Sequence, residues 1–430
     1  MRCRVAYDIS VLGMSHFYQR SRTGIFRVVD ENLKCLLQAS DVKLTLTSCR
    51  AYWEMAASLQ FVKHFYPDYI EQFSLPIPPK SYTSLIYKLE KRLVDYNWER
   101  ATNQTLINQI AKRFSKIPIE QLFPPQLQFE NIDLFHFPFF KVGNLEFVQS
   151  KPCIFTMHDL IPIKFPQYFK YRESRHLKNA IHRIRKEQDY VICVSEATKQ
   201  DFCALSSMHP DRIFVVSNGV GEAFYPTMDK ATIATTTQKY QIPKSPYILS
   251  LATLEPRKNL DFLVRGFLKY VRETHDQDTC LVLVGTLGWK YDRILESLPD
   301  VDPKLRSRII LTGYIPDEDL SAIYSGASVF VYPSLYEGFG LPPLEAMQCG
   351  TPVITSNTSS LPEVVNNAGI MIDPYQEDEL CQALSKVLNN AELRNEMSQN
   401  SLQRASQFSW KKCAEQTAEV YQIAVNNSLR

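Results

Sequence analysis

Short apolar runs alternate with helix-like segments along most of the chain, and this alternation constrains the fold more than any other feature of the sequence. Apolar runs separated by amphipathic segments are typical of parallel strands covered by helices on both faces of a sheet. The strands expected in the first half are Arg4–Ile9, Lys43–Thr47, Leu134–His136, Cys153–Met157, Tyr190–Val194 and Ile213–Val216. Those expected in the second half are Tyr247–Ala252, Cys280–Val284, Ile309–Leu311, Val329–Tyr332, Pro352–Thr355 and Gly369–Ile372. Helices are expected between them, for instance over Leu260–Glu273, Asp317–Tyr324 and Asp378–Leu388.

The two series of strands are separated by Phe224–Pro246, which is rich in Thr, Lys and Pro and has no apolar periodicity. We interpret this segment as a linker with one short helix. The sequence therefore predicts an α/β protein with two Rossmann-like, doubly wound parallel-sheet domains, whose strands end at a common cleft. The expected boundaries are an N-terminal domain over 1–226, a linker over 227–246, a C-terminal domain over 247–408 and a final helical segment over 409–430.

The stretch 51–114 does not follow this alternation. Apolar residues recur there at helical spacing, and many aromatic and basic residues are interspersed, from Trp53 and Lys63 to Arg92 and Trp98. One interpretation is a helical insertion packed on the first domain. The other is an interfacial patch that rests on a membrane and admits a lipid-linked substrate.

Composition excludes several classes of protein. Lys and Arg number 48 and Asp and Glu 46, so the net charge of +2 gives no reason to expect a nucleic-acid partner. The ten cysteines contain no CxxC pair, which favours reduced thiols in a cytosolic compartment and no zinc site. Asp8 interrupts the first apolar run, so no signal peptide is expected. No run reaches the roughly 20 apolar residues of a membrane span.

The segment Tyr332–Val365 carries the most chemical information. It leaves an expected strand, turns through Glu337-Gly338-Phe339-Gly340 and enters an expected helix near Leu341. Free N–H groups and the helix dipole favour a phosphate at such a position. Glu337 lies at the mouth of the loop and Glu345 lies in the helix, where each carboxylate can accept hydrogen bonds from neighbouring sugar hydroxyls. The pattern favours a sugar–diphosphate–ribose ligand; the alternative is an ordinary turn whose glycines relieve strain.

Two adjacent basic residues, Arg257 and Lys258, follow the first expected strand of the C-terminal domain. The planar fork of an arginine and the point charge of a lysine can together neutralise a diphosphate. The alternative is a solvated helix start with Asn259 as its N-cap.

Several of these segments resemble a known family. The run EGFGLPPLE, with Glu337 and Glu345 in an E-x7-E arrangement, is similar to the signature of family 4 retaining glycosyltransferases of GT-B fold. Further blocks resemble that family and occur in its order: MHDL (157–160), VSEATK (194–199), NGV (218–220), LEPRKN (254–259) and LVGTLGW (283–289). The resemblance extends from about Tyr7 to Tyr421 and leaves 51–114 uncovered. It implies a last helix, near Ser409–Tyr421, that crosses back to the first domain.

The resemblance also implies roles for individual positions. Arg257 and Lys258 match the pair that binds the donor diphosphate, and Glu337 matches the glutamate at the donor sugar. The backbone amides that would hold sugar and phosphate oxygens are those of Gly338, Phe339, Gly340 and Leu341.

The remaining matches lie on both sides of the expected cleft. Glu345 matches the residue that binds the donor ribose, and the backbone of Tyr314 and Ile315 resembles the nucleobase contact. On the first domain, Gly24 resembles a loop that closes over the phosphate, although the family often has two glycines there. His158 resembles the histidine beside the reacting sugar; its alternative is a hydrogen-bonded turn residue.

Metal-dependent transfer was also considered, because DxD pairs hold divalent cations in other glycosyltransferases. The pairs with this spacing are Asp276/Asp278, Asp300/Asp302 and Asp317/Asp319. The first two lie in polar connectors and the third lies near a helix start, where acidic residues are favoured in any case. We interpret all three as solvated surface, and we expect no metal and no cofactor.

Together with these residues, the resemblance implies a metal-independent glycosyltransferase that moves a hexose or deoxyhexose from a nucleotide-diphosphate donor, and the resemblance of LEPRKN (254–259) favours GDP-mannose. The expected acceptor is a glycan or lipid-linked glycan in surface polysaccharide synthesis, and the resemblance implies retention of configuration. The alternatives are a nucleotide-sugar epimerase or hydrolase of the same fold, and a non-catalytic sugar-nucleotide or glycan-binding protein. The expected location is cytoplasmic, with peripheral contact at the inner face of the membrane through residues 51–100.

Overall fold

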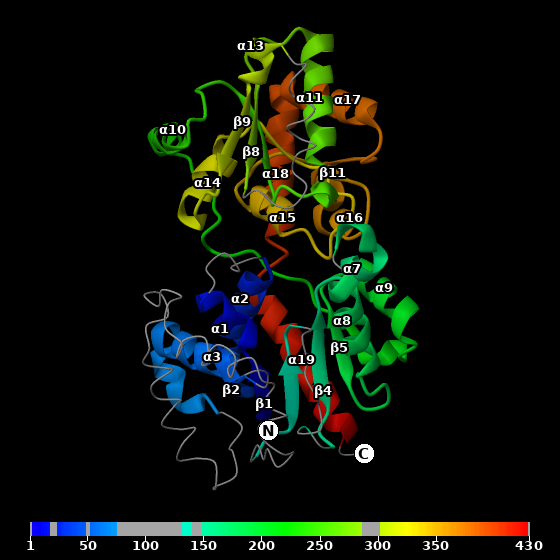
Figure 1. Ribbon diagram of the computed structural model, residues 1–430. Coiled ribbons are helices and arrows are strands. Elements are labelled where there is room, and N and C mark those ends of the chain that lie inside the picture. The colour runs from blue at the N-terminus through cyan, green and yellow to red at the C-terminus, as the bar shows by residue number, and fades with distance from the viewer. Residues whose placement is uncertain are drawn as a thin grey trace, which may run out of the picture.

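The described strands form two parallel six-stranded sheets, one in each half of the chain (Figure 1). The computed structural model describes residues 2–17, 24–48, 52–74, 131–139, 148, 150–169, 171–285 and 302–428. The first sheet has the order β2-β1-β3-β4-β5-β6 and the second has the order β12-β11-β10-β7-β8-β9. We call each sheet with its helices the N-terminal and the C-terminal domain.

All twelve expected strands are present, and each begins and ends within two residues of its predicted bounds. In the N-terminal domain they are β1 (Cys3–Asp8), β2 (Val42–Thr47), β3 (Leu134–Phe137), β4 (Cys153–Met157), β5 (Tyr190–Cys193) and β6 (Ile213–Val215). In the C-terminal domain they are β7 (Tyr247–Leu251), β8 (Cys280–Val284), β9 (Ile309–Gly313), β10 (Val329–Tyr332), β11 (Val353–Ser356) and β12 (Ile370–Ile372). Every residue of β4, β8 and β10 is buried, as expected for strands covered on both faces.

The strand order of the second sheet reverses between β7 and β10, which are hydrogen-bonded neighbours. The segments that follow these two strands therefore leave the sheet side by side at its carboxyl edge, where α/β proteins bind their ligands. The short helix η6 (Pro256–Lys258) follows β7, and a glycine-containing loop joins β10 to α15 (Leu341–Gln348).

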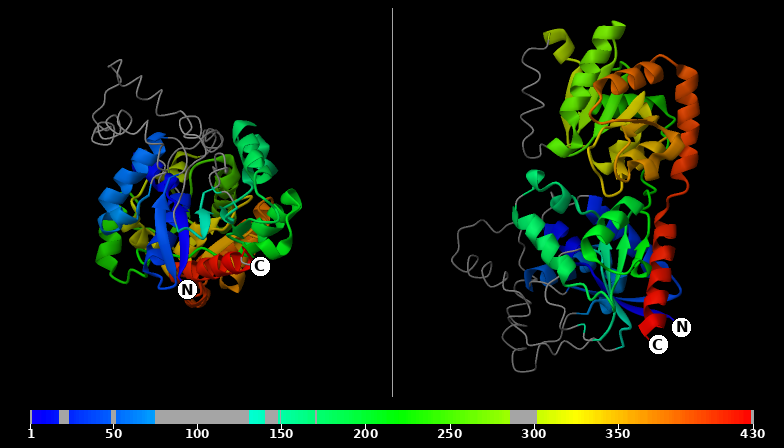
Figure 2. Two further views of the ribbon diagram at one scale, coloured as in Figure 1. Left: turned by 90° about the horizontal axis from the view of Figure 1, so that it is seen from below. Right: turned by 90° about the vertical axis from the view of Figure 1, so that its right-hand side faces the viewer.

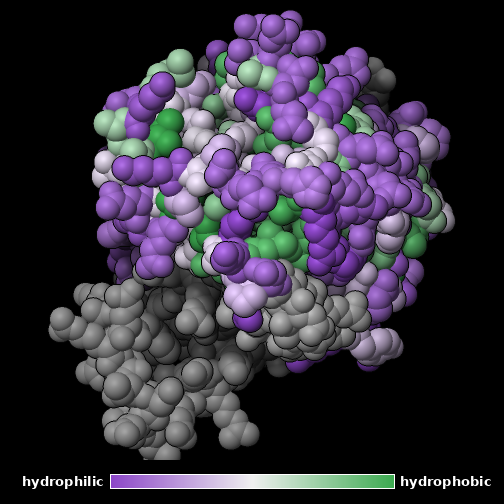
Figure 3. Space-filling view, turned by 90° about the horizontal axis from the view of Figure 1, so that it is seen from above, coloured by the Kyte–Doolittle hydropathy of each residue, from purple (hydrophilic) through white to green (hydrophobic). Residues whose placement is uncertain are grey.

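Helices cover both sheets. Those of the N-terminal domain are α1 (Ser10–Phe17), α2 (Gly24–Gln38), α3 (Tyr52–Phe65), η2 (Pro67–Gln72), α7 (Ile161–Lys164), η4 (Pro166–Tyr168), α8 (Tyr171–His182), α9 (Glu196–Ser206) and η5 (Pro210–Arg212). The C-terminal domain adds α11 (Leu260–Thr274), α13 (Pro303–Arg306), α14 (Asp317–Gly326), α16 (Leu361–Val365), η7 (Asn366–Ala368), α17 (Glu377–Leu388) and α18 (Ala391–Ala405). The helix α11 packs against α17 at Gly266, where an added Cβ would overlap the Leu380 side chain. Seen from above, hydrophilic residues cover most of the described surface of this end of the molecule (Figure 3).

The last helix, α19 (Trp410–Ser428), lies on the N-terminal domain, as predicted (Figure 2). Its buried residues Trp410, Cys413 and Tyr421 join the hydrophobic core beneath β1 and β2. The Tyr421 hydroxyl forms a hydrogen bond of 2.6 Å with Nδ1 of His136. Because the Thr156 hydroxyl occupies the other ring nitrogen at 2.8 Å, His136 is a core residue and not part of the cleft.

Other expectations have mixed outcomes. The predicted linker contains one helix, α10 (Lys230–Lys239). Of the stretch 51–114, the structure describes only α3 and η2 over 52–74; the rest lies outside the described residues. The nine cysteines within the described part of the chain are free. No helix among the described residues is long and apolar enough to cross a membrane.

Candidate functional site

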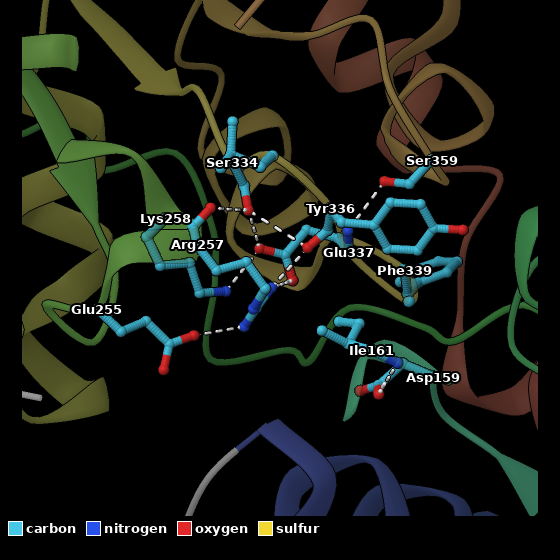
Figure 4. A network of polar contacts seen from close by, with 12 residues as sticks. Asp159, Ile161, Glu255, Arg257, Lys258, Ser334, Tyr336, Glu337, Phe339 and Ser359 are labelled. Carbon is cyan, nitrogen blue, oxygen red and sulfur yellow. Dashed lines mark hydrogen bonds and ion pairs between the residues drawn. The ribbon is translucent and has the colours of Figure 1, made fainter. Parts of the chain in front are cut away.

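The loop between β10 and α15 holds Glu337 in a buried hydrogen-bond network at the carboxyl edge of the sheet (Figure 4). The hydroxyls of Ser334 and Tyr332 donate to its Oε1 atom at 2.6 and 2.9 Å. Its backbone N–H donates to the Ser359 hydroxyl at 2.9 Å. Main chain and side chain of Glu337 are thus both fixed before any ligand is present.

The predicted basic pair meets Glu337 across the switch point of the sheet. Lys258 Nζ lies 2.6 Å from Glu337 Oε1, and Arg257 Nη1 lies 2.9 Å from Oε2. Arg257 also pairs through Nη2 with Glu255 at 2.6 Å. Both cations are mostly buried, with side chains 11% and 12% exposed, and both are paired with carboxylates, which does not fit a solvated helix start. Asn259 does precede α11, but it adopts a left-handed conformation and donates to the carbonyl of Pro374 instead of capping the helix.

Electrostatics keep Glu337 ionised. Burial alone would raise the pKa of its carboxyl group, but the neighbouring Arg257 and Lys258 lower this pKa to about 2. Burial and the adjacent guanidinium of Arg257 in turn lower the pKa of Lys258, while Glu337 acts in the opposite direction. The cluster therefore combines two cations with the two carboxylates of Glu255 and Glu337, and a bound anion would compete with these carboxylates for the cations.

Four consecutive backbone N–H groups in this loop are free. Those of Gly338, Phe339, Gly340 and Leu341 make no hydrogen bond within the described residues. The carbonyls of Glu337 and Phe339, by contrast, share the single hydroxyl proton of Ser360, whose oxygen lies 3.0 and 2.6 Å from them. Since Pro342 and Pro343 follow Leu341 and have no N–H, the donors come mainly from the loop and not from the first turn of α15. The Nε of Arg257 is also buried without a hydrogen-bond partner in the described structure.

Glu345 lies on α15 with its side chain only 4% exposed. Tyr324 donates a hydrogen bond to its Oε2 at 3.0 Å, and Arg27 of the N-terminal domain forms an ion pair with its Oε1. Burial raises the pKa of Glu345, while Arg27 lowers it. The guanidinium of Arg27 also binds both oxygens of Asp317, at 2.9 and 2.8 Å.

Sequence reasoning missed Arg27, although the residue lies three positions after the predicted Gly24. Asp317 was expected on the solvated surface, and its side chain is 49% exposed, but it also belongs to an ion-pair network between the domains that the sequence did not reveal. Asp319 is also engaged, by Lys239 at 2.6 Å and by Tyr240. The one sequence signal for Arg27 was its position three residues after the predicted Gly24. Its partner Glu345 lies 318 residues further along the chain, so the local sequence gives no indication of the ion pair.

The predicted residues of the N-terminal domain face the same loop. Gly24 begins α2, and a Cβ there would lie 3.5 Å from a methyl group of Leu341. The backbone of His158 approaches so closely that a Cβ at Gly338 would overlap the His158 carbonyl oxygen. The His158 ring bonds to the carbonyl of Pro138 at 2.7 Å, and burial lowers its pKa to about 4, so the ring is neutral near pH 7.

Asp159, which sequence reasoning did not select, also lies near the cluster (Figure 4). It accepts a hydrogen bond from the N–H of Ile161 at 3.0 Å. Burial raises the pKa of its carboxyl group, and Arg257 lowers it, so the charges of the two domains interact across the cleft.

Tyr314 and Ile315 follow β9, which is separated from β10 by β7 and β8. The structure therefore does not bring them into the Glu337 cluster. Tyr314 is 66% exposed and Ile315 is buried. The same connection continues into α14, whose first residue is Asp317, so this segment reaches the cleft through the contact with Arg27.

Among the residues that the structure describes, no group of three or more His, Cys, Asp or Glu side chains is arranged to hold a metal ion. Asp276 accepts from Thr279 at 2.7 Å and from Arg308 at 2.7 Å, which is a structural role. Asp300 lies outside the described residues. Metal independence remains a prediction.

Two family models match the chain. The model described as Glycosyl transferases group 1 matches residues 233–404, and the one described as Glycosyltransferase Family 4 matches residues 109–223. The first match covers η6, the Glu337 loop and α15, and the second covers His158 and α9.

Curated relatives include two proteins of Escherichia coli. The O-antigen chain mannosyltransferase B is 34% identical over 271 residues, which are 63% of this chain and 70% of that protein. The serotype-specific mannosyltransferase WbdA is 32% identical over 276 residues, which are 63% of this chain but only 33% of that protein. The chain thus spans about a third of the length of WbdA.

Solved structures share the fold over nearly the full length. Sucrose-phosphate synthase from Thermosynechococcus elongatus has a TM-score of 0.64 at 19% identity, with 98% of each chain covered. The HepE protein of Anabaena, solved in complex with UDP, has a TM-score of 0.63 at 16% identity, with 97% of this chain and 99% of that chain covered. At these identities the likeness concerns the arrangement of the two domains.

Proposed function

The chain belongs to the group 1 glycosyl transferases and is a glycosyltransferase of the GT-B fold, and on this premise we propose that it transfers mannose from GDP-mannose to a glycan or lipid-linked glycan in the synthesis of a surface polysaccharide. The relatives named above support the choice of sugar, because two of them are mannosyltransferases at 34% and 32% identity. The base of the donor nucleotide is part of the proposal.

The observation that carries this proposal is the set of free N–H groups from Gly338 to Leu341 beside the buried cations Arg257 and Lys258. Backbone donors that have no partner within the described residues are available to phosphate and sugar oxygens, and preorganised donors of this kind stabilise an anion without reorganisation. The unpartnered Nε of Arg257 adds one more donor that a phosphate oxygen satisfies.

In the reaction, the bond between the sugar C1 and the diphosphate oxygen breaks, and the diphosphate leaves with the electron pair. The acceptor hydroxyl oxygen forms the new bond to C1 on the same face, and its proton passes to the departing phosphate oxygen. Negative charge therefore grows on the diphosphate as positive charge grows on the sugar ring. Arg257, Lys258 and the loop amides stabilise the first of these charges more in the transition state than in the ground state.

We assign Glu337 an orienting role and not that of a covalent nucleophile. Its Oε1 atom is already held by Lys258, Ser334 and Tyr332, and its pKa of about 2 makes the carboxylate a weak base. Its negative charge stabilises the cationic sugar ring, and its position orients the hydroxyls. The neutral ring of His158 supplies a hydrogen-bonding group on the opposite side of the loop without adding a charge.

Glu345 suits the ribose. A carboxylate offers about four lone-pair sites, and Tyr324 and Arg27 occupy only part of this capacity. The two ribose hydroxyls would bind beside Arg27, whose positive charge then faces the nucleotide from the other domain.

The first test is a thermal-shift panel with GDP-mannose, GDP, UDP-glucose, dTDP-glucose and ADP-glucose. A ligand at 100 times its Kd stabilises the native protein by about 2.7 kcal/mol. Of these five ligands, we expect only GDP-mannose and GDP to raise the melting temperature of the protein. Stabilisation by a different nucleotide would refute the choice of donor, and stabilisation by none would refute the proposal as a whole.

A second measurement separates transfer from the alternative of hydrolysis. With GDP-mannose and octyl α-mannoside, we expect a disaccharide product whose anomeric configuration, read by NMR, is that of the donor. Release of free mannose at the same rate without acceptor would favour a hydrolase, and an inverted product would refute retention.

We also propose that the N-terminal domain contacts an anionic membrane surface. Basic residues outnumber acidic ones among the exposed side chains in and just after α8. The exposed acidic residues there are Glu173 and Glu187, and the exposed basic residues are Arg172, Arg175, Lys178, Arg183 and Lys186. Each basic residue near an anionic surface contributes about 1 kcal/mol. We expect cosedimentation with phosphatidylglycerol vesicles and not with phosphatidylcholine vesicles, and an R172E/R175E/K178E variant should lose it. Equal binding of this variant would refute the proposal.

A further inference from the structure

We propose that Ser195 and Thr198 of the N-terminal domain are positioning residues for the donor loop, which reaches its active geometry only when the two domains are closed. This inference rests on the proposed transfer from a nucleotide sugar at the Glu337 loop. It assigns a role to the first turn of α9, whose residues touch neither the cations nor Glu337 in the described structure.

The first contact is between two side chains of one domain and one carbonyl of the other. The hydroxyl of Ser195 donates to the carbonyl oxygen of Gly338 at 2.7 Å, and that of Thr198 donates to the same oxygen at 3.1 Å. Both residues are almost fully buried, at 1% and 3% exposure. Because a carbonyl oxygen has two lone pairs, these two donors saturate it.

This contact fixes the direction of an amide. The peptide bond is planar and trans, so the carbonyl of Gly338 and the N–H of Phe339 point in opposite directions. Fixing the carbonyl on α9 therefore fixes the orientation of the Phe339 N–H, which is one of the four free donors of the loop. The absence of a side chain at Gly338 allows a second close approach from the same domain, since a Cβ there would overlap the carbonyl of His158.

A second contact joins the same turn of α9 to α16, which begins directly after Ser360, the residue that binds carbonyls of the loop. The carboxylate of Glu363, on α16, accepts hydrogen bonds from the N–H groups of Glu196 and Ala197, each at 2.7 Å. A carboxylate is favoured at this position because the positive end of the α9 dipole lies there. Ser360, three residues before Glu363, donates to the carbonyls of Glu337 and Phe339. The α9 turn thus holds the loop directly and also through α16.

Together these contacts engage three successive carbonyls of the loop: Gly338 accepts from Ser195 and Thr198, and Glu337 and Phe339 share the hydroxyl proton of Ser360. The N–H groups from Gly338 to Leu341 have no partner within the described residues. When the domains separate, the Gly338 carbonyl loses both donors and Glu363 loses two. The direction of the donor amides is therefore coupled to closure, so the stabilisation of the leaving diphosphate is complete only in the closed enzyme.

The test uses the full chain with the S195A/T198V double variant. Each hydrogen bond lost from the loop reduces stabilisation by roughly a factor of three to ten, so we expect kcat with GDP-mannose and octyl α-mannoside to fall about ten- to a hundredfold in the double variant. Affinity for GDP, measured by calorimetry, should fall clearly less than kcat, because Arg257, Lys258 and Glu345 keep their assigned contacts and the misdirected loop amide contributes only part of the binding of the diphosphate. The conservative S195T and T198S variants should retain kcat.

Ser195 also caps α9, so a control must account for lost helix stability. Asn390 caps α18 in the same way, by accepting from the N–H of Leu393, and its N390A variant should keep kcat. Wild-type kcat in S195A/T198V would overturn the inference, as would a loss of GDP affinity equal to the loss of kcat. Failure of the wild-type protein itself to bind or turn over GDP-mannose would instead overturn the proposed function.

Discussion

Replacement of Arg27 by methionine tests the ion-pair network between the domains. Methionine keeps much of the length of the arginine side chain but removes its charge, so the buried Glu345 keeps, among the described residues, only the hydroxyl of Tyr324 as a hydrogen-bond partner. Breaking a fully buried pair costs about 3–5 kcal/mol. Because the Arg27 side chain is 25% exposed and that of Glu345 is 4% exposed, we expect a loss of about 2–3 kcal/mol in the free energy of unfolding. The pair with Asp317, which is 49% exposed, adds about 0–1 kcal/mol.

The loss should depend on pH in a defined direction. Burial already raises the pKa of Glu345, and removal of Arg27 takes away the interaction that lowers it. The carboxyl group then binds a proton more tightly in the folded than in the unfolded chain, so the variant loses stability as pH rises through the folded-state pKa. Protonation at low pH removes the unpaired charge, and R27M should therefore be less destabilised at pH 5 than at pH 8.

The assay is urea unfolding of the wild type and R27M at pH 5, 6.5 and 8, followed by circular dichroism. Arg265 provides a matched control, because it also pairs with two carboxylates, those of Asp261 and Glu377, but is 43% exposed. R265M should cost no more than about 1 kcal/mol and show no such pH dependence. The R27M/E345Q double variant should lose the pH dependence. If R27M costs no more than R265M at all three values, the reasoning about the buried carboxylate is wrong.

Two further substitutions test the loop and its cations. K258A removes a buried charge that faces the departing diphosphate, so kcat/KM should fall at least about a hundredfold and GDP affinity should weaken; wild-type turnover would remove the assignment to the diphosphate. G338A places a Cβ against the His158 carbonyl and should prevent closure, which lowers kcat while GDP still binds. Its control is G221A, since a Cβ at Gly221 would lie 4.0 Å from its nearest neighbour; equal kcat in G338A and G221A would contradict the close approach.

The sheets were predictable from sequence because both faces of each are covered. Runs such as Cys153–Met157 and Val329–Tyr332 are short and mainly apolar, and few other structures fit that pattern. The loop after Tyr332 could also be predicted from the sequence, since glycines, prolines and two glutamates occur there at a spacing that a strand-to-helix turn explains.

Contacts between the domains were not predictable in the same way. Arg27 appears as one basic residue in a helix, and nothing in its local sequence indicates a partner 318 residues away. The block from Val194 to Lys199 could be recognised by resemblance, but its hydrogen bonds to Gly338 depend on how the two sheets face each other. The ion pair of Asp317 was missed for a related reason: its place at a helix start explains an acidic residue without any partner.

The chain passes between the two domains twice, and the two passages are adjacent. An isolated bridge pairs Val220 with Ser409, and Gly219 lies so close to the backbone of Trp410 that no side chain fits between them. Two bodies tied at one place by parallel segments can swing about it, but they cannot slide past each other. A rotation of the domains about this point therefore brings the same residues of the two domains back into contact each time the domains close.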